Sequence, residues 1–271
     1  MTTMTPVGTG SVTQLSILRS EWIKLRSLRS TWWSLGMMVV FTAGLGWLFG
    51  FARAHDFHKN VRNGGLMFIP DPATISLNGI MLAQLVVGVL GVLVVTGEYS
   101  TRQVLSTMSA VPHRLPILVG KSVMFAVVGG IVAEIATVLA FVLGQAALAS
   151  THQQAHWDSV GSTRAVFGAG LYLVLIGLLG SGLGFILRNT AAAISLLMVL
   201  VLVLPLLVQV LPSPYNQDIA KFLPLMAGTQ IIATPIKNPD WLAPWVGLGV
   251  MALWSAAALV AGAVVLRRRD C

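Results

Sequence analysis

The sequence predicts an all-α polytopic membrane protein with six transmembrane helices. Hydrophobic residues make up 56% of its 271 residues and charged residues only 10%, and the mean hydropathy is +0.83. These values lie outside the range of soluble domains. The chain also contains six apolar runs close to the roughly 20 residues that a helix needs to cross a hydrocarbon core. Because the runs are continuous and do not alternate with polar residues, they favour a helical bundle over a β-barrel.

The chain is expected to divide into a short tail and one membrane domain. Residues 1–13 are small and polar and are predicted to be disordered. Residues 14–271 form the membrane domain. Its predicted spans are residues 32–51, 75–95, 117–143, 166–187, 191–211 and 244–266.

The stretch QLSILRSEWIKLRSLRST, which precedes the first span, predicts an amphipathic helix that lies along the cytoplasmic interface. The alternative is a basic flank that only anchors the topology. The expected apolar stripe is Leu15, Leu18, Trp22 and Leu25, and the expected polar face is Ser16, Ser20, Lys24 and Ser27.

The distribution of basic residues predicts that both termini are cytoplasmic. The formal net charge is +8, and most of the 17 lysine and arginine residues fall on the side that holds the termini. We therefore expect a multi-pass protein of the cell (plasma) membrane, and the basic pI does not require a nucleic-acid partner. The basic residues on this side are Arg19, Lys24, Arg26, Arg29, Arg102, Arg114, Lys121, Arg188 and Arg267 to Arg269.

Two further features concern packing and the outer face. Gly180 and Gly184 form a small-xxx-small pair in the fourth span, which lets helix backbones approach closely within the bundle or in a dimer. The connection over residues 212–243 is long and still fairly apolar, which predicts short helices that dip into the outer leaflet.

The connection between the second and third spans reads GEYSTRQVLSTMSAVPHRLPILVGKS. The run EYSTRQVLSTMSA is polar and compatible with a helix, and the prolines of VPHRLP force a turn before the next span. This pattern predicts a short cytoplasmic coupling helix through which a soluble partner could move two spans together. An ordinary interhelical loop is the alternative.

The triplet Gly120, Lys121 and Ser122 matches only the end of a phosphate-binding loop. The first glycine position of that loop is Leu115, prolines stand at 112 and 116, and no strand precedes it. We therefore interpret Lys121 as the basic residue that marks the cytoplasmic start of the third span.

Two acidic residues are candidates for function. Glu98 could cap a helix N-terminus or contact a basic groove on a partner. Glu134 lies deep inside the third span, where an ionisable group is costly and marks a candidate functional site. It could hydrogen-bond a neighbour such as Asn78, Gln84 or Gln145, or it could contact a substrate or a cation.

No catalytic, cofactor-binding or metal-binding residues are assigned, so a membrane enzyme is disfavoured. All five histidines lie outside the predicted spans, and Glu134 is the single acid within them. The pairs His55/His58 and His152/His156 have helical ligand spacing but lack a clear third ligand, so they are interpreted as solvated loop residues.

The stretches LRSEWIKLRSLRSTWW and GEYSTRQVLSTMSAVPHRLPILVGKS resemble the permease subunits of ABC-2 type transporters, in particular those common in high-GC Gram-positive bacteria. The resemblance covers most of the chain, including the number of spans. The family pattern after the second span is matched at Gly97, Glu98, Tyr99, Thr107, Ala110, Val111, Pro112 and Arg114. The sequence departs from that pattern at Arg102, Gln103, Leu105 and Met108.

This resemblance implies the transmembrane subunit of an ATP-driven exporter. Such a subunit works with a second permease copy or a paralogue, and with separate ATPase subunits that bind ATP and Mg. Because the expected pathway faces are apolar, with Trp, Met and Phe scattered along them, its cargo would be a hydrophobic or amphipathic small molecule, peptide or lipid. The alternative is a secondary transporter that uses Glu134 and an ion gradient.

The resemblance also implies which residues lie near the ATPase. The ATPase-coupling residues would be Glu98, Tyr99, Arg102, Thr107, Pro112 and Arg114. The interfacial helix would place Trp22, Lys24 and Arg26 close to the same partner.

Overall fold

The computed structural model describes residues 14–27, 29–65, 68–69, 71–100, 115–212, 215–234 and 241–268. The predicted polar tail and most of the predicted coupling helix lie outside these residues. Every regular element in the described part of the chain is a helix, which confirms the all-α prediction.

Six helices of the described chain are long and apolar enough to cross a membrane, as predicted. Two of them contain a short π-helical segment, and the second is broken after its first turns. In chain order, the elements that build these spans are α2 (Arg29–Val39), η1 (Val40–Gly44) and α3 (Leu45–Arg62); α4 (Pro72–Leu77) and α5 (Ile80–Ser100); α7 (Leu115–Leu148); α8 (Ser162–Leu187); α9 (Thr190–Met198), η3 (Val199–Val203) and α10 (Leu204–Gln209); and α13 (Pro244–Arg268).

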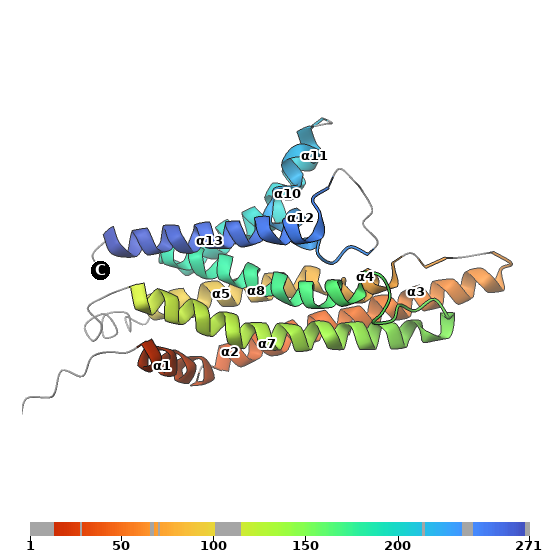
Figure 1. The fold of residues 1–271 in the computed structure, drawn as a ribbon, viewed down its shortest axis with the longest axis horizontal. Coiled ribbons are helices and arrows are strands. Elements are labelled where there is room, and N and C mark those ends of the chain that lie inside the picture. Colours follow the sequence, from red (N-terminus) through yellow and green to blue (C-terminus); the bar gives the residue numbers. More distant parts are fainter. Residues whose placement is uncertain are drawn as a thin grey trace, which may run out of the picture.

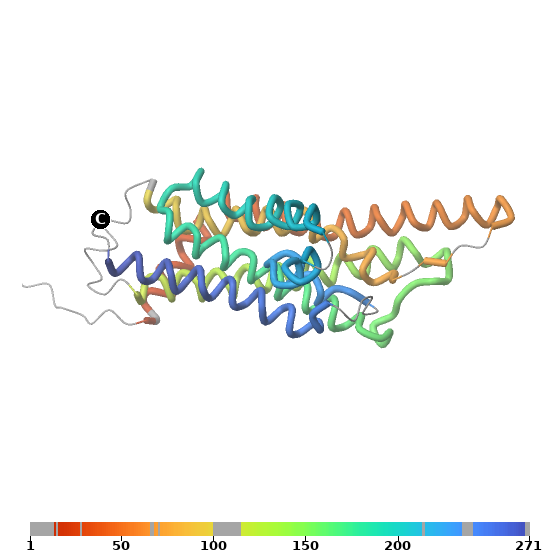
Figure 2. The backbone as a smooth tube through the Cα atoms, turned by 90° about the horizontal axis from the view of Figure 1, so that it is seen from above, coloured from red at the N-terminus to blue at the C-terminus, as the bar shows by residue number. Residues whose placement is uncertain are grey.

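The first span continues well beyond its predicted end at residue 51. Helix α3 runs to Arg62 and projects from the end of the bundle (Figures 1 and 2). The stretch FARAHDFHKNVR is polar but contains neither proline nor a glycine, so nothing in it ends the helix. His55 and His58 therefore lie on a helix, and their interpretation as loop residues was wrong.

The long connection before the last span contains short helices, as expected. They are α11 (Tyr215–Ala220) and α12 (Pro224–Thr229), and α12 packs against α13. Asp71, at the start of the second span, binds this connection at Thr234. Its carboxylate accepts hydrogen bonds from the backbone N–H and the hydroxyl of Thr234, while it also caps α4 at Thr74.

Helix α8 forms the centre of the bundle, where α5, α7 and α13 pack around it. Its glycines permit close approach to α5. A Cβ on Gly180 would lie 2.2 Å from the carbonyl oxygen of Gly88, and one on Gly91 would lie 2.0 Å from that of Gly177. Gly180 therefore serves packing within the bundle.

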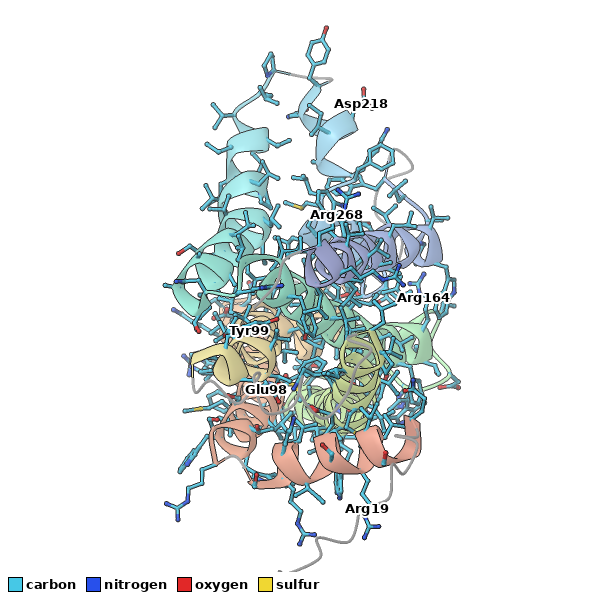
Figure 3. All side chains as sticks on the ribbon, turned by 90° about the vertical axis from the view of Figure 1, so that its left-hand side faces the viewer. Arg19, Glu98, Tyr99, Arg164, Asp218 and Arg268 are labelled. Carbon is cyan, nitrogen blue, oxygen red and sulfur yellow. The ribbon has the colours of Figure 1, made fainter. Side chains whose placement is uncertain are left out.

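The N-terminal helix α1 (Gln14–Ser27) lies across one end of the bundle, where α13 also ends (Figures 1 and 3). Its helical structure was predicted, but the orientation of its faces was not. Ile17, Glu21 and Leu25 face the bundle, whereas Trp22 is 42% exposed. Of the expected stripe, Leu25 is buried, Leu18 is half-buried and Trp22 is exposed, because Glu21 occupies the face of α1 that meets the bundle.

Candidate functional site

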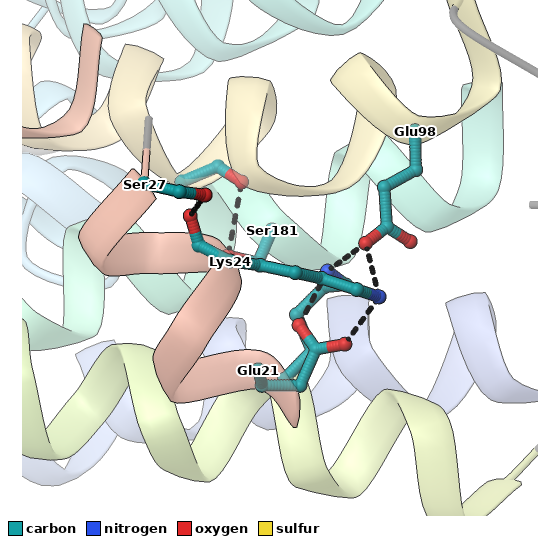
Figure 4. Close-up of polar contacts among 7 residues, drawn as sticks. Glu21, Lys24, Ser27, Glu98 and Ser181 are labelled. Atoms are coloured by element: carbon teal, nitrogen blue, oxygen red, sulfur yellow. Dashed lines mark hydrogen bonds and ion pairs between the residues drawn. The ribbon is translucent and has the colours of Figure 1, made fainter. Parts of the chain in front are cut away.

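Four charged residues from three helices meet beneath α1, and we call them the charge cluster (Figure 4). Glu21 and Lys24 come from α1, Glu98 from α5 and Lys121 from α7. Lys121 Nζ lies 2.7 Å from Glu21 Oε2 and 2.9 Å from Glu98 Oε1. Lys24 Nζ lies 2.8 Å from Glu21 Oε1 and 2.8 Å from Glu98 Oε1. Each lysine therefore binds both carboxylates.

The charge cluster is largely shielded from solvent. The side chains of Glu21, Lys121 and Glu98 are 3%, 5% and 13% exposed, and that of Lys24 is 30% exposed. Two carboxylates and two ammonium groups balance in charge. Burying them carries a large desolvation penalty, so the complete cluster adds little net stability, whereas removal of one member leaves an uncompensated buried charge.

The surroundings of Lys24 keep its ammonium group charged. Burial by itself lowers the pKa of Lys24, but the hydrogen bonds to Glu21 and Glu98 and the attraction of both carboxylates outweigh it, so the pKa is raised. The stabilisation from a raised lysine pKa is present at neutral pH and is lost only as the pH rises through that value. The ammonium group of Lys24 is therefore charged at physiological pH.

Local structure explains how α1 reaches the cluster. Glu21 and Lys24 lie three residues apart on one helix face. One turn earlier, Ile17 sits against Gly120, where an added Cβ would lie 2.7 Å from Ile17 Cγ2. The absence of a side chain at Gly120 lets α1 approach α7 closely enough for Glu21 to reach Lys121.

The cluster also explains the position of Glu98 within the described residues. Glu98 lies in the last turn of α5, where the helix dipole disfavours a negative charge. Lys24 and Lys121 offset this cost. The carboxylate of Glu98 is thus engaged within the chain, while the helix it was expected to cap lies in residues 101–114, outside the described part of the chain.

Tyr99, the next residue, also turns toward the bundle. It packs on a buried apolar group that includes Val95, Leu118 and Phe185. The guanidinium carbon of Arg188 lies 5.5 Å from the centre of its ring, within the range of a cation–π contact. Arg188 ends α8 with a left-handed backbone, so Tyr99 ties the end of α5 to the end of α8.

The structure brings some predicted coupling residues together and leaves others untested. Glu98 and Tyr99 anchor the end of α5, whereas Arg102, Thr107, Pro112 and Arg114 lie outside the described residues. On α1, Lys24 belongs to the cluster, while Trp22 and Arg26 are exposed. Arg19 points away from the bundle (Figure 3). The outer face of α1 thus offers cationic and aromatic side chains to a partner or to lipid headgroups.

Sequence reasoning missed Glu21, and it interpreted Lys121 as a topology marker without predicting its ion pairs. The sequence did contain a signal for each residue. Glu21 is the single acid in a strongly basic stretch, and Lys121 stands inside an otherwise apolar run. Neither signal identifies the other residue as its partner, because 100 residues separate them.

Glu134 lies on α7 beside Gly170 of α8. A Cβ on Gly170 would lie 2.5 Å from Oε1 and 2.7 Å from Oε2 of Glu134. Glu134 Oε2 is buried and has no hydrogen-bond partner in the described part of the chain. Two of the three expected neighbours bond elsewhere: Gln84 accepts from the hydroxyl of Tyr172, and Gln145 donates to Ser76. The structure therefore gives no support to Glu134 as a residue that hydrogen-bonds Gln84 or Gln145.

Within the described residues, no three His, Cys, Asp or Glu side chains are grouped to hold a metal ion. His58 instead contacts the hydroxyl of Ser150, with Nε2 and Oγ 3.0 Å apart.

Comparison of the whole chain with protein-family models and with curated proteins finds no match.

Proposed function

We propose that this chain is the transmembrane subunit of an ATP-driven exporter and that a separate ATPase acts on the end of the bundle that carries α1. Two kinds of observation support this proposal. The chain has six helices that can cross a membrane, and its sequence resembles ABC-2 type permeases at both stretches that flank the cytoplasmic end. It would pair with a second copy or a paralogue in the plasma membrane, with both termini in the cytoplasm.

The observation that carries the proposal is the charge cluster. Residues 101–114, the stretch expected to couple to the ATPase, follow α5 and precede α7. Glu98 lies just before this stretch and Lys121 just after it, and the two are ion-paired. Through Glu21 and Lys24, α1 is joined to both helices. A force applied to residues 101–114 or to α1 would therefore reach α5 and α7 together.

The distribution of charge supports the orientation that coupling needs. The described basic residues at the α1 end include Arg19, Arg26, Arg188 and Arg268, in accord with a cytoplasmic location. Since this sequence lacks a complete phosphate-binding loop, ATP and Mg would be bound by the partner. We place Arg102, Thr107, Pro112 and Arg114 at that contact.

Purification of the chain from native membranes tests the proposal. We expect a protein that carries a phosphate-binding loop to co-purify with it, and the purified complex to hydrolyse ATP. The Lys221→Met variant is altered at the ion pair with Asp218, which lies on the side of the molecule away from Arg19 (Figure 3), and it should retain the partner. Recovery of the chain with no nucleotide-binding protein would count against the proposal.

A second candidate function is gradient-driven transport. It is favoured by the carboxylate oxygen of Glu134 that has no hydrogen-bond partner among the residues described. The isolated chain in proteoliposomes separates the two. An exporter subunit alone should accumulate no solute under a proton or sodium gradient. Uptake that depends on the gradient and is lost in Glu134→Gln would favour the secondary transporter.

A further inference from the structure

A groove runs along the surface of α7 and α8 in the apolar part of the bundle. Its volume is about 750 Å³, within the range of sites that hold drug-sized molecules. Its apolar walls include Val127, Ile131 and Leu171, which are 51%, 59% and 44% exposed. Exposure of such residues on a membrane-spanning helix means contact with lipid, so the groove can be reached from within the bilayer.

Glu134 is the ionisable residue among those that line the groove. Helix α7 advances ~1.5 Å per residue, so Glu134 lies roughly 20 Å along the axis from Lys121 of the charge cluster. That depth is well inside a hydrocarbon core of about 30 Å. The carboxyl group rests against Gly170, and its Oε2 has no hydrogen-bond partner among the described residues.

The chemistry of the groove constrains its occupant. A carboxylate in hydrocarbon is costly unless a counter-charge or hydrogen-bond donors accompany it. A neutral apolar occupant would fill the groove but leave this group unpaired, and an anion would be repelled. A lipophilic cation satisfies both parts of the groove, because its apolar groups contact the walls while its charge pairs with Glu134.

We propose that the groove on α7 and α8 binds a lipophilic organic cation from the bilayer, with Glu134 as the counter-charge. As an assignment of cargo, this inference rests on the proposed export function. The binding itself does not require an ATPase, so the two can fail separately.

Equilibrium binding of radiolabelled tetraphenylphosphonium to the purified chain in detergent tests the proposal. We expect saturable binding to the wild type and an affinity lower by about tenfold or more in Glu134→Gln, because a desolvated charge pair is lost. Tetraphenylborate, an anion of the same shape, should show no saturable binding. The Asp218→Asn variant, which removes an exposed carboxylate beside Lys221, should bind the cation as the wild type does.

A second variant tests the groove while it leaves Glu134 in place. A Cβ on Gly130 would only just contact Val174, at 3.4 Å, so Gly130→Leu should fold and fill the groove. We expect it to weaken binding of the cation by a similar factor. The proposal is overturned if the wild type shows no saturable binding, if Glu134→Gln binds with unchanged affinity, or if the anion binds equally well. Cation binding without a co-purified ATPase would leave the groove assigned and the export function refuted.

Discussion

We expect the free energy of unfolding of the Lys121→Met variant to be about 3–5 kcal/mol lower than that of the wild type. This is the usual cost of breaking a buried ion pair. Lys121 is 5% exposed and contacts both carboxylates of the charge cluster. Methionine fills a similar space but leaves Glu21 and Glu98 with Lys24 alone. Chaotrope titration of the purified chain in mixed micelles measures the loss.

A matched lysine shows whether the effect belongs to the cluster. Lys221 pairs with Asp218, which is 63% exposed, so Lys221→Met should cost no more than about 1 kcal/mol. The double variant Lys121→Met/Glu21→Gln restores the balance of charge and should recover much of the lost stability. Equal stability of Lys121→Met and the wild type would mean that the cluster does not hold these helices.

A disulfide between α1 and α7 tests whether the charge cluster acts by holding these two helices together or through its charges. The Cβ of Ile17 lies 3.8 Å from the position of a Cβ on Gly120, which suits a disulfide. In a Cys271→Ser background, Ile17→Cys with Gly120→Cys should form this bond under oxidation. We expect Lys121→Met to weaken ATPase coupling in the complex because it loosens α1 from α7. We expect the disulfide to restore this coupling and reductant to reverse the rescue.

The second large effect is expected at the contact of α5 and α8. In Gly91→Ala, the new methyl group would lie 2.0 Å from the carbonyl oxygen of Gly177. Overpacking costs about 1–3 kcal/mol and occasionally more. We expect the upper end here, because the opposing atom belongs to the backbone and cannot turn away.

Gly249→Ala is the control, because no atom of the described residues lies within 4 Å of a Cβ at that position in α13. Alanine is the better helix former by about 1 kcal/mol, so this variant should be as stable as the wild type or slightly more so. Both variants can be compared by thermal unfolding in the same detergent. A Gly91→Ala variant with an unchanged midpoint would contradict the close contact of α5 and α8.

The spans were predictable because apolar runs of sufficient length dictate helices in a bilayer. The projecting part of α3 was missed because polar composition was interpreted as a loop, although the stretch contains no residue that ends a helix. Polarity ended the membrane crossing there, but it did not end the helix.

The candidate site was harder to predict because it depends on contacts between distant residues. Periodicity placed Lys24 on the polar face of α1. The face of α1 that meets the bundle is instead set by the pairing of Glu21 with Lys121 from another helix. Likewise, Glu134 was identified by its depth in the third span alone. Its partners were predicted from their polarity, but Gln84 and Gln145 bond elsewhere. Pairings of this kind follow from three-dimensional packing and leave no local pattern.

Photo-crosslinking from α1 in intact cells tests most directly whether a nucleotide-binding partner contacts the inner end of the bundle. A photoreactive residue at position 19, on the outward face of α1, is compared with one at position 160, which is 92% exposed between α7 and α8. We expect position 19 to crosslink to a protein that carries a phosphate-binding loop, and position 160 not to do so. Capture of such a protein from position 160 alone, or labelling of position 19 by a membrane-impermeant reagent added outside the cells, would contradict both the orientation and the proposed coupling.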